Sequence, residues 1–200
     1  MPSRLPFTLA MLTALIGFGI YGETHVGPLH PNVHHVVGYS PRLLLDGEVH
    51  RLLTSLFFTA GGWKFYVSLL MFGGVVGWME WFRGTYRTML AFFGCHLLTL
   101  LVMLGIILPL AATESLHGTL LYSVRDVGPS AGYYGCLGCI TVGASARGRL
   151  VPIGIVVLLL ARLAHSGLLL PQQGLALAAD VAHAIAFPLG MIGSAWLRRS

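Results

Sequence analysis

Two polar side chains in this sequence could carry out nucleophilic chemistry together, although both lie in apolar surroundings. Ser130 occurs in the cluster Gly-Pro-Ser-Ala-Gly, residues 128–132, ahead of a glycine-rich apolar run. A serine hydroxyl is a weak nucleophile and needs a general base within hydrogen-bond reach. His183, which ends the stretch Ala-Asp-Val-Ala-His within the last apolar run, is a candidate base. The sequence therefore offers a serine–histidine pair, provided that the fold brings the two residues together.

The composition identifies the chain as a membrane protein. Of its 200 residues, 56% are hydrophobic and 10% are charged, and the mean hydropathy is +0.78. Soluble domains carry about 25% charged residues, so a soluble fold is excluded. The Lys and Arg residues are scattered without a basic stripe, which argues against nucleic acid as a partner and leaves the lipid bilayer. The length predicts a single domain, residues 1–200.

Six apolar stretches predict an all-α polytopic membrane protein. Their lengths bracket the roughly 20 residues that a helix needs to cross a bilayer. Two of them, 63–79 and 130–144, are short and rich in glycine, so neighbouring helices should hold them. A mixed segment, about 22–62, precedes the core helices at about 63–196, and a loop is expected at about 111–127. The six stretches are about 5–21, 63–79, 88–110, 130–144, 150–170 and 175–196.

The basic residues predict the orientation of these spans. With the N-terminus inside, seven basic residues lie in cytoplasmic segments and four lie outside, and Arg162 lies within the fifth span. This distribution fits the positive-inside rule and places both termini in the cytoplasm. The serine cluster then faces the outside, and His183 lies at a similar depth in the last span. The inner residues are Arg4, Arg83, Arg87, Arg147, Arg149, Arg198 and Arg199; the outer ones are Arg42, Arg51, Lys64 and Arg125.

Four short motifs follow one another in a characteristic order along the chain. They are Glu48-Val49-His50-Arg51-Leu52-Leu53-Thr54, Glu80 with Arg83-Gly84, Gly128-Pro129-Ser130-Ala131 with Tyr134, and Ala182-His183 with Ala186 and Gly190. Together with the six spans, this order resembles the rhomboid family of intramembrane serine proteases. That family has an entry motif Trp-Arg…Thr, a Gly-x-Ser-Gly…Tyr on the fourth core helix and an alanine–histidine on the sixth. The resemblance extends from about residue 46 to the C-terminus and implies a six-helix rhomboid-like bundle.

By this resemblance, Ser130 attacks the scissile carbonyl and His183 is the general base of a dyad. Tyr134 would pack against the imidazole, Gly128 would let the backbone approach the substrate, and the Ser130 amide would face the oxyanion. Ala186 and Gly190, with Gly135 and Gly138, would let the two helices approach closely. The implied substrates are single-pass membrane proteins cut near the outer face, without cofactor or metal. The implied location is the bacterial inner membrane.

Three positions depart from the family pattern. Lys64 and Ser68 stand where the family has a histidine and an asparagine that help to form the oxyanion hole, and Ala131 replaces the glycine after the nucleophile. Lys64 and Ser68 could rebuild the hole as donors. If they do not, the loss of one such donor typically costs about 10²–10³ in rate. The alternative is therefore an inactive rhomboid-like protein that binds membrane partners or serves as a structural subunit.

Asp180 and the serine motif each admit a second interpretation. Asp180 lies one helical turn before His183 and either orients the imidazole or sits solvated at the outer rim. The serine cluster also matches the Gly-x-Ser-x-Gly of α/β-hydrolases, but that motif requires a strand before it and a helix after it in a soluble sheet protein. We take this second match as accidental.

A metal or haem site is the remaining rival hypothesis. Four histidines crowd the first outer segment and two more lie within spans, but their spacing matches no tight ligand pattern. Cys136 and Cys139 form a Cys-x-x-Cys without a second pair, so we expect them, like Cys95, to be buried free thiols. The histidines are His25, His30, His34, His35, His96 and His165.

Overall fold

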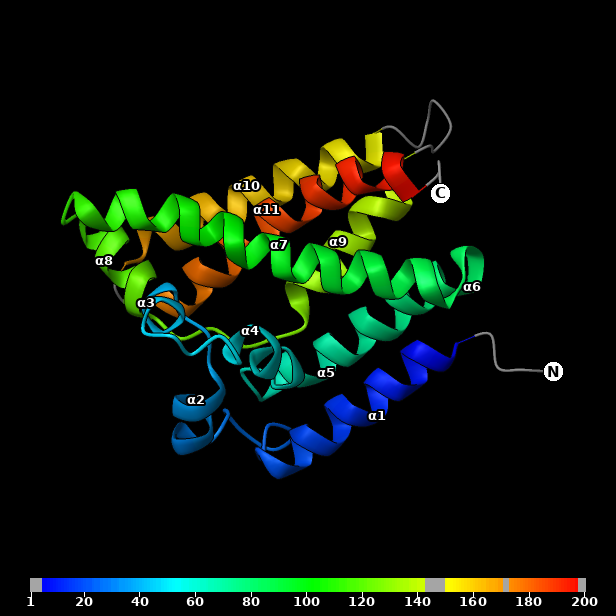
Figure 1. Ribbon diagram of the computed structural model, residues 1–200, viewed down its shortest axis with the longest axis horizontal. Coiled ribbons are helices and arrows are strands. Elements are labelled where there is room, and N and C mark those ends of the chain that lie inside the picture. The colour runs from blue at the N-terminus through cyan, green and yellow to red at the C-terminus, as the bar shows by residue number, and fades with distance from the viewer. Residues whose placement is uncertain (1–4, 143–149, 171–172, 198–200) are drawn as a thin grey trace.

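The computed structural model describes residues 5–142, 150–170 and 173–197, and these residues form helices without any strand (Figure 1). Isolated β-bridges join Pro28 to Gly61 and Tyr39 to Asp126. The first eight elements are α1 (Pro6–Tyr21), α2 (Pro31–Val37), α3 (Pro41–Leu45), α4 (Arg51–Thr54), the 3₁₀-helix η1 (Ser55–Phe57), α5 (Trp63–Met71), the π-helix η2 (Phe72–Val76) and α6 (Gly77–Arg83). They are followed by α7 (Thr85–Ala112), α8 (Leu116–Ser123), α9 (Ser130–Thr141), α10 (Leu150–Leu168) and α11 (Gly174–Leu197).

Among the described residues, four helical stretches are long and apolar enough to cross a membrane. They are Trp63–Arg83, which joins α5, η2 and α6, then Thr85–Ala112, Leu150–Leu168 and Gly174–Ala195. The protein is therefore an all-α membrane protein. The helices at the expected first and fourth spans are shorter than these four: α1 has 16 residues and α9 has 12. Twelve helical residues rise only roughly 18 Å, and the expected end of the fourth span, at residue 144, lies outside the described residues.

In Figure 1, α1, the run α5–α6, α7, α9, α10 and α11 follow one another in alternating directions between two ends of the molecule. The start of α1 and the ends of α6 and α11 lie at one end (Figure 1), which we call the Glu80 end. There, the Arg83 guanidinium donates to the Cys139 carbonyl of α9 at 2.8 Å and to Ser194 Oγ of α11 at 3.3 Å. Gly84 has φ +81°, a conformation that favours glycine, and it separates α6 from α7 so that the chain reverses.

Glu80 fastens the start of α1 to the end of α6. Its buried carboxylate accepts from the amides of Phe7 and Thr8, from Thr8 Oγ1 and from Thr85 Oγ1, at 2.6–2.9 Å. The first amides of a helix have no partner within the helix, and the residue before α1, Leu5, has no capping side chain. A carboxylate from another helix therefore takes the place of a local cap.

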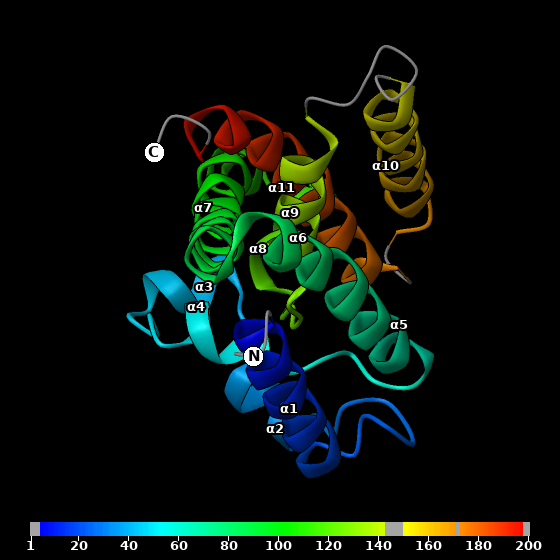
Figure 2. The ribbon, with the colours of Figure 1, turned by 90° about the vertical axis from the view of Figure 1, so that its right-hand side faces the viewer.

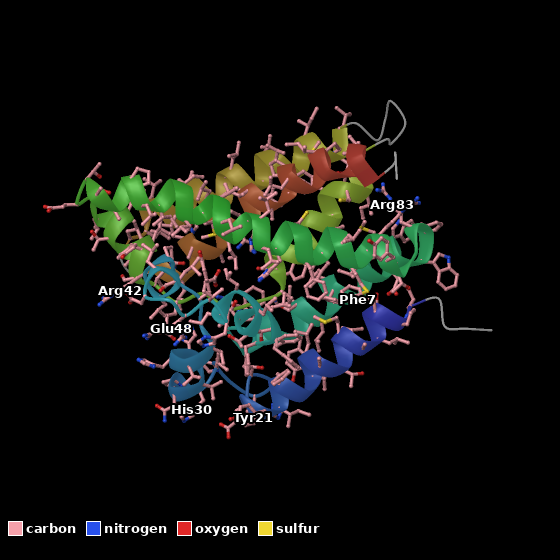
Figure 3. The ribbon with its side chains drawn as sticks, viewed as in Figure 1. Phe7, Tyr21, His30, Arg42, Glu48 and Arg83 are labelled. Atoms are coloured by element: carbon pink, nitrogen blue, oxygen red, sulfur yellow. The ribbon has the colours of Figure 1, made fainter. Side chains whose placement is uncertain are left out.

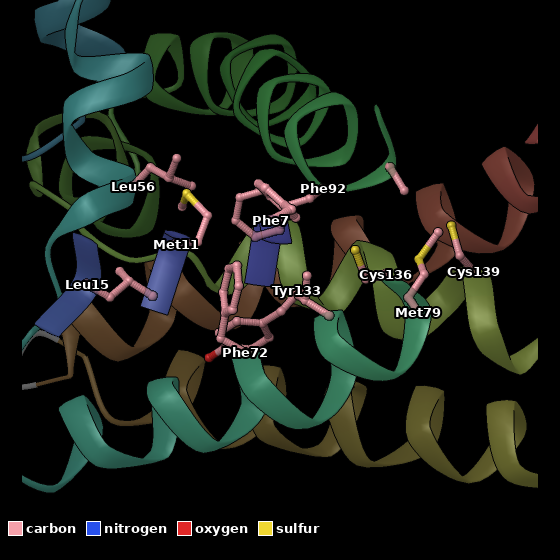
Figure 4. Packing of buried hydrophobic residues seen from close by; sticks show 12 residues of the cluster. Phe7, Met11, Leu15, Leu56, Phe72, Met79, Phe92, Tyr133, Cys136 and Cys139 are labelled. Atoms are coloured by element: carbon pink, nitrogen blue, oxygen red, sulfur yellow. The ribbon is translucent and has the colours of Figure 1, made fainter. Parts of the chain in front are cut away.

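Aromatic rings from three segments fill the core beside this end (Figure 4). Phe7 of α1 lies 6.1 Å from Phe72 and 5.7 Å from Phe92 between ring centroids, and Phe72 lies 5.2 Å from Phe92. Tilted and edge-to-face contacts of this kind add to the hydrophobic gain of burial. They tie α1, η2 and α7 together, and α9 joins the same cluster through Tyr133, Cys136 and Cys139.

The segment at 22–62 and the expected loop at 111–127 contain short helices. Prolines open α2 and α3, where a missing amide costs nothing, and Ser40 and Ser115 cap α3 and α8 with their hydroxyls. Arg51 is buried and donates to the carbonyls of His35 and Gly38, both at 2.9 Å, while it pairs with Glu48. This guanidinium therefore holds the segment 22–62 in place.

Two of the seven basic residues that were expected inside lie together at the Glu80 end. Arg83 and Arg87 lie at the Glu80 end, and Arg42 and Glu48 lie at the opposite end (Figure 3). Five of the seven residues expected inside, Arg4, Arg147, Arg149, Arg198 and Arg199, lie outside the described residues. The side on which each end lies stays a prediction.

Candidate active site

A cavity of about 330 Å³ brings together six of the nine residues singled out in the sequence. Ser130, His183, Tyr134, Lys64, Ser68 and Gly128 all line it, from α5, α9, α11 and the loop before α9. Ala131, Ala186 and Gly190 do not line it, and all three are buried. The cavity is therefore the candidate active site.

The loop before α9 presents Ser130 at the first helical position. Gly128 has φ +147°, which favours glycine, and its amide donates to the Ser55 carbonyl at 2.9 Å. That amide is therefore not free to bind an oxyanion, although Gly128 does lie at the cavity wall. The Ser130 amide, in contrast, donates to no group of the described chain, as expected for the first turn of a helix.

The ring of Tyr134, one turn after Ser130, stacks on the imidazole of His183. The ring centroids lie 4.2 Å apart with an angle of 28° between planes. His183 is only 7% exposed, and neither of its ring nitrogens has a hydrogen-bond partner within the described residues. The structure thus places the serine and the histidine at one cavity without a hydrogen bond between them, and the tyrosine fixes the plane of the imidazole.

Glycines bring α9 and α11 into backbone contact beneath the cavity. A Cβ atom on Gly190 would collide with the Gly135 carbonyl, and one on Gly138 would collide with the Phe187 carbonyl. Ala186 is fully buried in the same interface. Helices approach this closely only where small residues face each other, so these positions set the distance between Ser130 and His183.

The two expected oxyanion residues sit differently in the cavity wall. Lys64 is exposed, at the start of α5, whereas Ser68 is buried and interacts with the Tyr133 hydroxyl. A lysine on a flexible side chain is a mobile donor. Ser68, by contrast, is already engaged by a neighbouring residue.

Asp180 is buried and paired with Arg162, so the expectation that it sits solvated at the outer rim is wrong. Its side chain is 4% exposed, and its Oδ1 accepts from Arg162 Nη2 at 2.8 Å and from Nε at 3.1 Å. The same oxygen lies 3.8 Å from His183 Nδ1, which is too long for a hydrogen bond. A buried carboxylate requires a partner, and the partner comes from α10.

Two charged residues of this cavity, Arg162 and Asp126, were not expected in the site from the sequence. Arg162 carried a signal, because an ionisable residue within a span is costly and usually functional. Asp126 carried none, since it lies in a loop. There, burial raises the pKa of the Asp126 carboxyl to about 6, against the opposing effects of the Val127 amide and the Lys64 charge.

Three histidines of the segment 22–62 contact other groups of the protein. His34 Nε2 and His35 Nε2 contact the backbone and the guanidinium of Arg125, at 3.1 and 3.2 Å. His25 Nδ1 lies 3.4 Å from the Gly19 carbonyl. Within the described ranges, no three His, Cys, Asp or Glu residues gather as a metal site would require. Cys95, Cys136 and Cys139 are free and buried, as predicted.

No family model matches the chain, and no curated protein matches it either. The class of all-α membrane protein rests on the four long apolar helices. Any finer assignment depends on the cavity and its residues.

Proposed function

We propose that the protein is a rhomboid-type intramembrane serine protease that cleaves single-pass membrane proteins. The observation that carries the proposal is the cavity lined by both Ser130 and His183, with the Tyr134 ring stacked on the imidazole at 4.2 Å. A polar serine–histidine–tyrosine group in an apolar bundle is energetically costly, and such groups are usually functional. The six alternating helical segments also suit a six-span bundle in which α1 and α9 are short spans.

In the proposed reaction, the Ser130 hydroxyl attacks the carbonyl carbon of the scissile bond and gives its proton to His183. Since Nδ1 faces Asp180, Nε2 is the nitrogen left for the serine. The protonated imidazole then delivers the proton to the leaving amine, and an acyl-enzyme ester remains on Ser130. Water, deprotonated by His183, hydrolyses this ester and regenerates both groups.

The oxyanion would be stabilised chiefly by the Ser130 amide, which has no partner in the described protein and stands at a helix N-terminus. Lys64 is the second proposed donor, because it lines the cavity and carries its ammonium on a flexible side chain. Ser68 is a weaker candidate, since Tyr133 already engages it. No cofactor or metal is needed for this chemistry.

The proposed orientation places both termini in the cytoplasm of a bacterial inner membrane. The Glu80 end, with Arg83 and Arg87, would then face inward. The cavity mouth would lie toward the outer face, where a substrate segment with weak helical propensity can unwind into it.

The competing proposal is an inactive rhomboid-like protein that binds membrane partners. One observation favours it: both ring nitrogens of His183 lack partners in the described chain, so the histidine forms no hydrogen bond with the serine. Catalytic hydrogen bonds are often formed only once substrate is bound, so chemistry must decide between the two.

Labelling with an uncharged fluorophosphonate separates these proposals. An active protease should be labelled as wild type and as Ser166→Ala, a buried serine whose hydroxyl bonds to the Leu163 carbonyl away from the cavity. Ser130→Ala and His183→Ala should abolish labelling and cleavage of a single-pass substrate, each nearly as fully as the double variant. Equal labelling of wild type and Ser130→Ala would refute the assignment, and a folded but unlabelled wild type would favour the binding protein.

A further inference from the structure

We propose that Arg162 determines specificity by binding a carboxylate side chain on the membrane segment that occupies the cavity. The inference deepens the proposed function and rests on it, since it names the class of segment that the same cavity accepts: one that carries Asp or Glu. The arrangement of Arg162 and Asp180 carries it.

The ion pair between α10 and α11 turns its positive member toward the cavity. Arg162 lines the cavity and its side chain is 51% exposed, whereas Asp180 is 4% exposed and is not part of the lining. The counter-ion therefore lies behind the guanidinium. A ligand that enters the cavity meets the cation first.

The guanidinium also keeps most of its hydrogen-bonding capacity. Of its five N–H donors, those used belong to Nε and Nη2, and both point at the same oxygen, Asp180 Oδ1. Within the part of the chain that the structure describes, three donors remain without a partner, among them both on Nη1. Arginine commonly binds a second carboxylate through such a free edge, so a ligand need not displace Asp180.

Arg162 lies close enough to the proposed catalytic group to act on a segment bound there. It is within electrostatic range of His183 and Tyr134, which share the cavity with Ser130. It also stands on α10, the least buried of the four long helices, which lies at the edge of the bundle (Figure 2). An arginine at such a position is costly in a bilayer. Pairing with Asp180 does not by itself explain why the Arg162 guanidinium also lines the cavity.

The remaining charges of the cavity do not compete with this role. Lys64 and Asp126 act on each other, and their charges offset at neutral pH. His34 also lines the cavity, but burial lowers its pKa, which favours the neutral ring. Among the described residues that line the cavity, Arg162 is therefore the cation whose counter-ion lies outside the wall.

The test measures binding, so it does not depend on catalysis. Full-length Ser130→Ala protein in phosphatidylcholine nanodiscs is titrated with single-pass peptides of about twenty residues. The peptides carry Glu, Gln or Lys at one of several successive helical turns. At one position, the Glu peptide should bind roughly tenfold or more tightly than the Gln peptide, as a hydrogen bond to a charged partner implies.

Arg162→Gln alone would leave Asp180 buried without its cation and could unfold the protein. The decisive variant is therefore Arg162→Gln with Asp180→Asn. It removes both charges together, so that no charge is left buried without a partner. It should bind the Glu and Gln peptides equally, whereas Arg42→Gln, an exposed arginine of α3, should keep the preference. Equal binding of the Glu and Gln peptides by the parent, or a preference that survives in the double variant, would overturn the proposal.

Two further measurements distinguish peptide recognition by Arg162 from lipid binding and from catalysis. If phosphatidylglycerol abolishes the Glu preference at equal ionic strength, a lipid headgroup occupies Arg162 and the proposal fails. Fluorophosphonate labelling of protein with Ser130 intact tests the protease assignment alone. A charge preference without labelling would leave Arg162 as a recognition residue of a binding protein, so the two failures are distinguishable.

Discussion

Replacing Glu80 with Gln should destabilise the protein although the side chain keeps its size. The carboxylate accepts four hydrogen bonds: Oε1 from the Phe7 amide and Thr85 Oγ1, and Oε2 from the Thr8 amide and Thr8 Oγ1. A glutamine offers one oxygen and one NH₂ group. The threonine hydroxyls can turn to accept from that NH₂, but the backbone amides cannot.

The magnitude follows from this geometry. Whichever way the amide group is turned, one backbone N–H of α1 faces another donor in a buried site. A hydrogen bond to a charged group contributes about 1.5–3 kcal/mol, and the favourable interaction of the carboxylate with the N-terminus of α1 is lost as well, about 0.3–1 kcal/mol. We therefore expect Glu80→Gln to lower the free energy of unfolding by about 2–4 kcal/mol.

Equilibrium unfolding in mixed micelles of dodecyl maltoside and increasing SDS, followed by tryptophan fluorescence, measures this loss. Thr85→Val removes one of the four bonds and should cost less than Glu80→Gln. Asp46→Asn is the matched control, because the Asp46 side chain is 59% exposed and forms only a long ion pair with Arg42, at 3.9 Å. It should change the free energy of unfolding by under about 0.5 kcal/mol. A Glu80→Gln loss no larger than that of Asp46→Asn would refute the capping role of Glu80.

Three further predictions concern packing, pH and orientation. Gly138→Ala and Gly190→Ala should each destabilise by about 1–3 kcal/mol, because the added Cβ meets backbone of the facing helix, whereas Gly193→Ala, whose Cβ would enter open space, should be neutral or stabilising in the same unfolding assay. Burial raises the pKa of Asp126 to about 6, so between pH 4 and 6 the native state holds a proton that the unfolded chain has released. Stability should therefore fall as the pH rises through this window, and Asp126→Asn should flatten the dependence; an unchanged pH profile would contradict it. A reporter fused after Ser200 should respond from the cytoplasm and one inserted at Glu114, between α7 and α8, from the outside; reports from one side would rule out the alternating course of the helices.

The class of protein could be predicted from the sequence because a membrane-spanning helix is a local property. Continuous apolar runs define the four long helices at 63–83, 85–112, 150–168 and 174–195, and the expected runs differ from them mainly at their ends. The observed end of a helix differs from the expected one where contacts with other helices help to determine it. The second span continues to Arg83, for example, because Gly84 ends α6 and because Arg83 finds acceptors on α9 and α11.

The candidate site could be anticipated only as a set of residue types. The sequence identified Ser130, His183 and Tyr134 as polar or aromatic residues near the starts of two apolar runs, and a motif order suggested that they meet. The contact of Tyr134 with His183 was expected only from the resemblance, because the residue types alone do not give how closely α9 approaches α11. That approach is set by Gly135 and Gly190, which lie more than fifty residues apart in the chain.

The burial of Asp180 was decided by the tertiary structure alone. Seen locally, Asp180 is a carboxylate near the start of a helix, where solvent is the ordinary partner. In the fold, Arg162 comes from the neighbouring helix and supplies a charge that makes burial tolerable. The same holds for Glu80, whose four donors come from α1 and α7. Hydrophobic runs act within one helix and are readable along the chain, whereas pairing of buried charges acts between helices and exists only once they have packed.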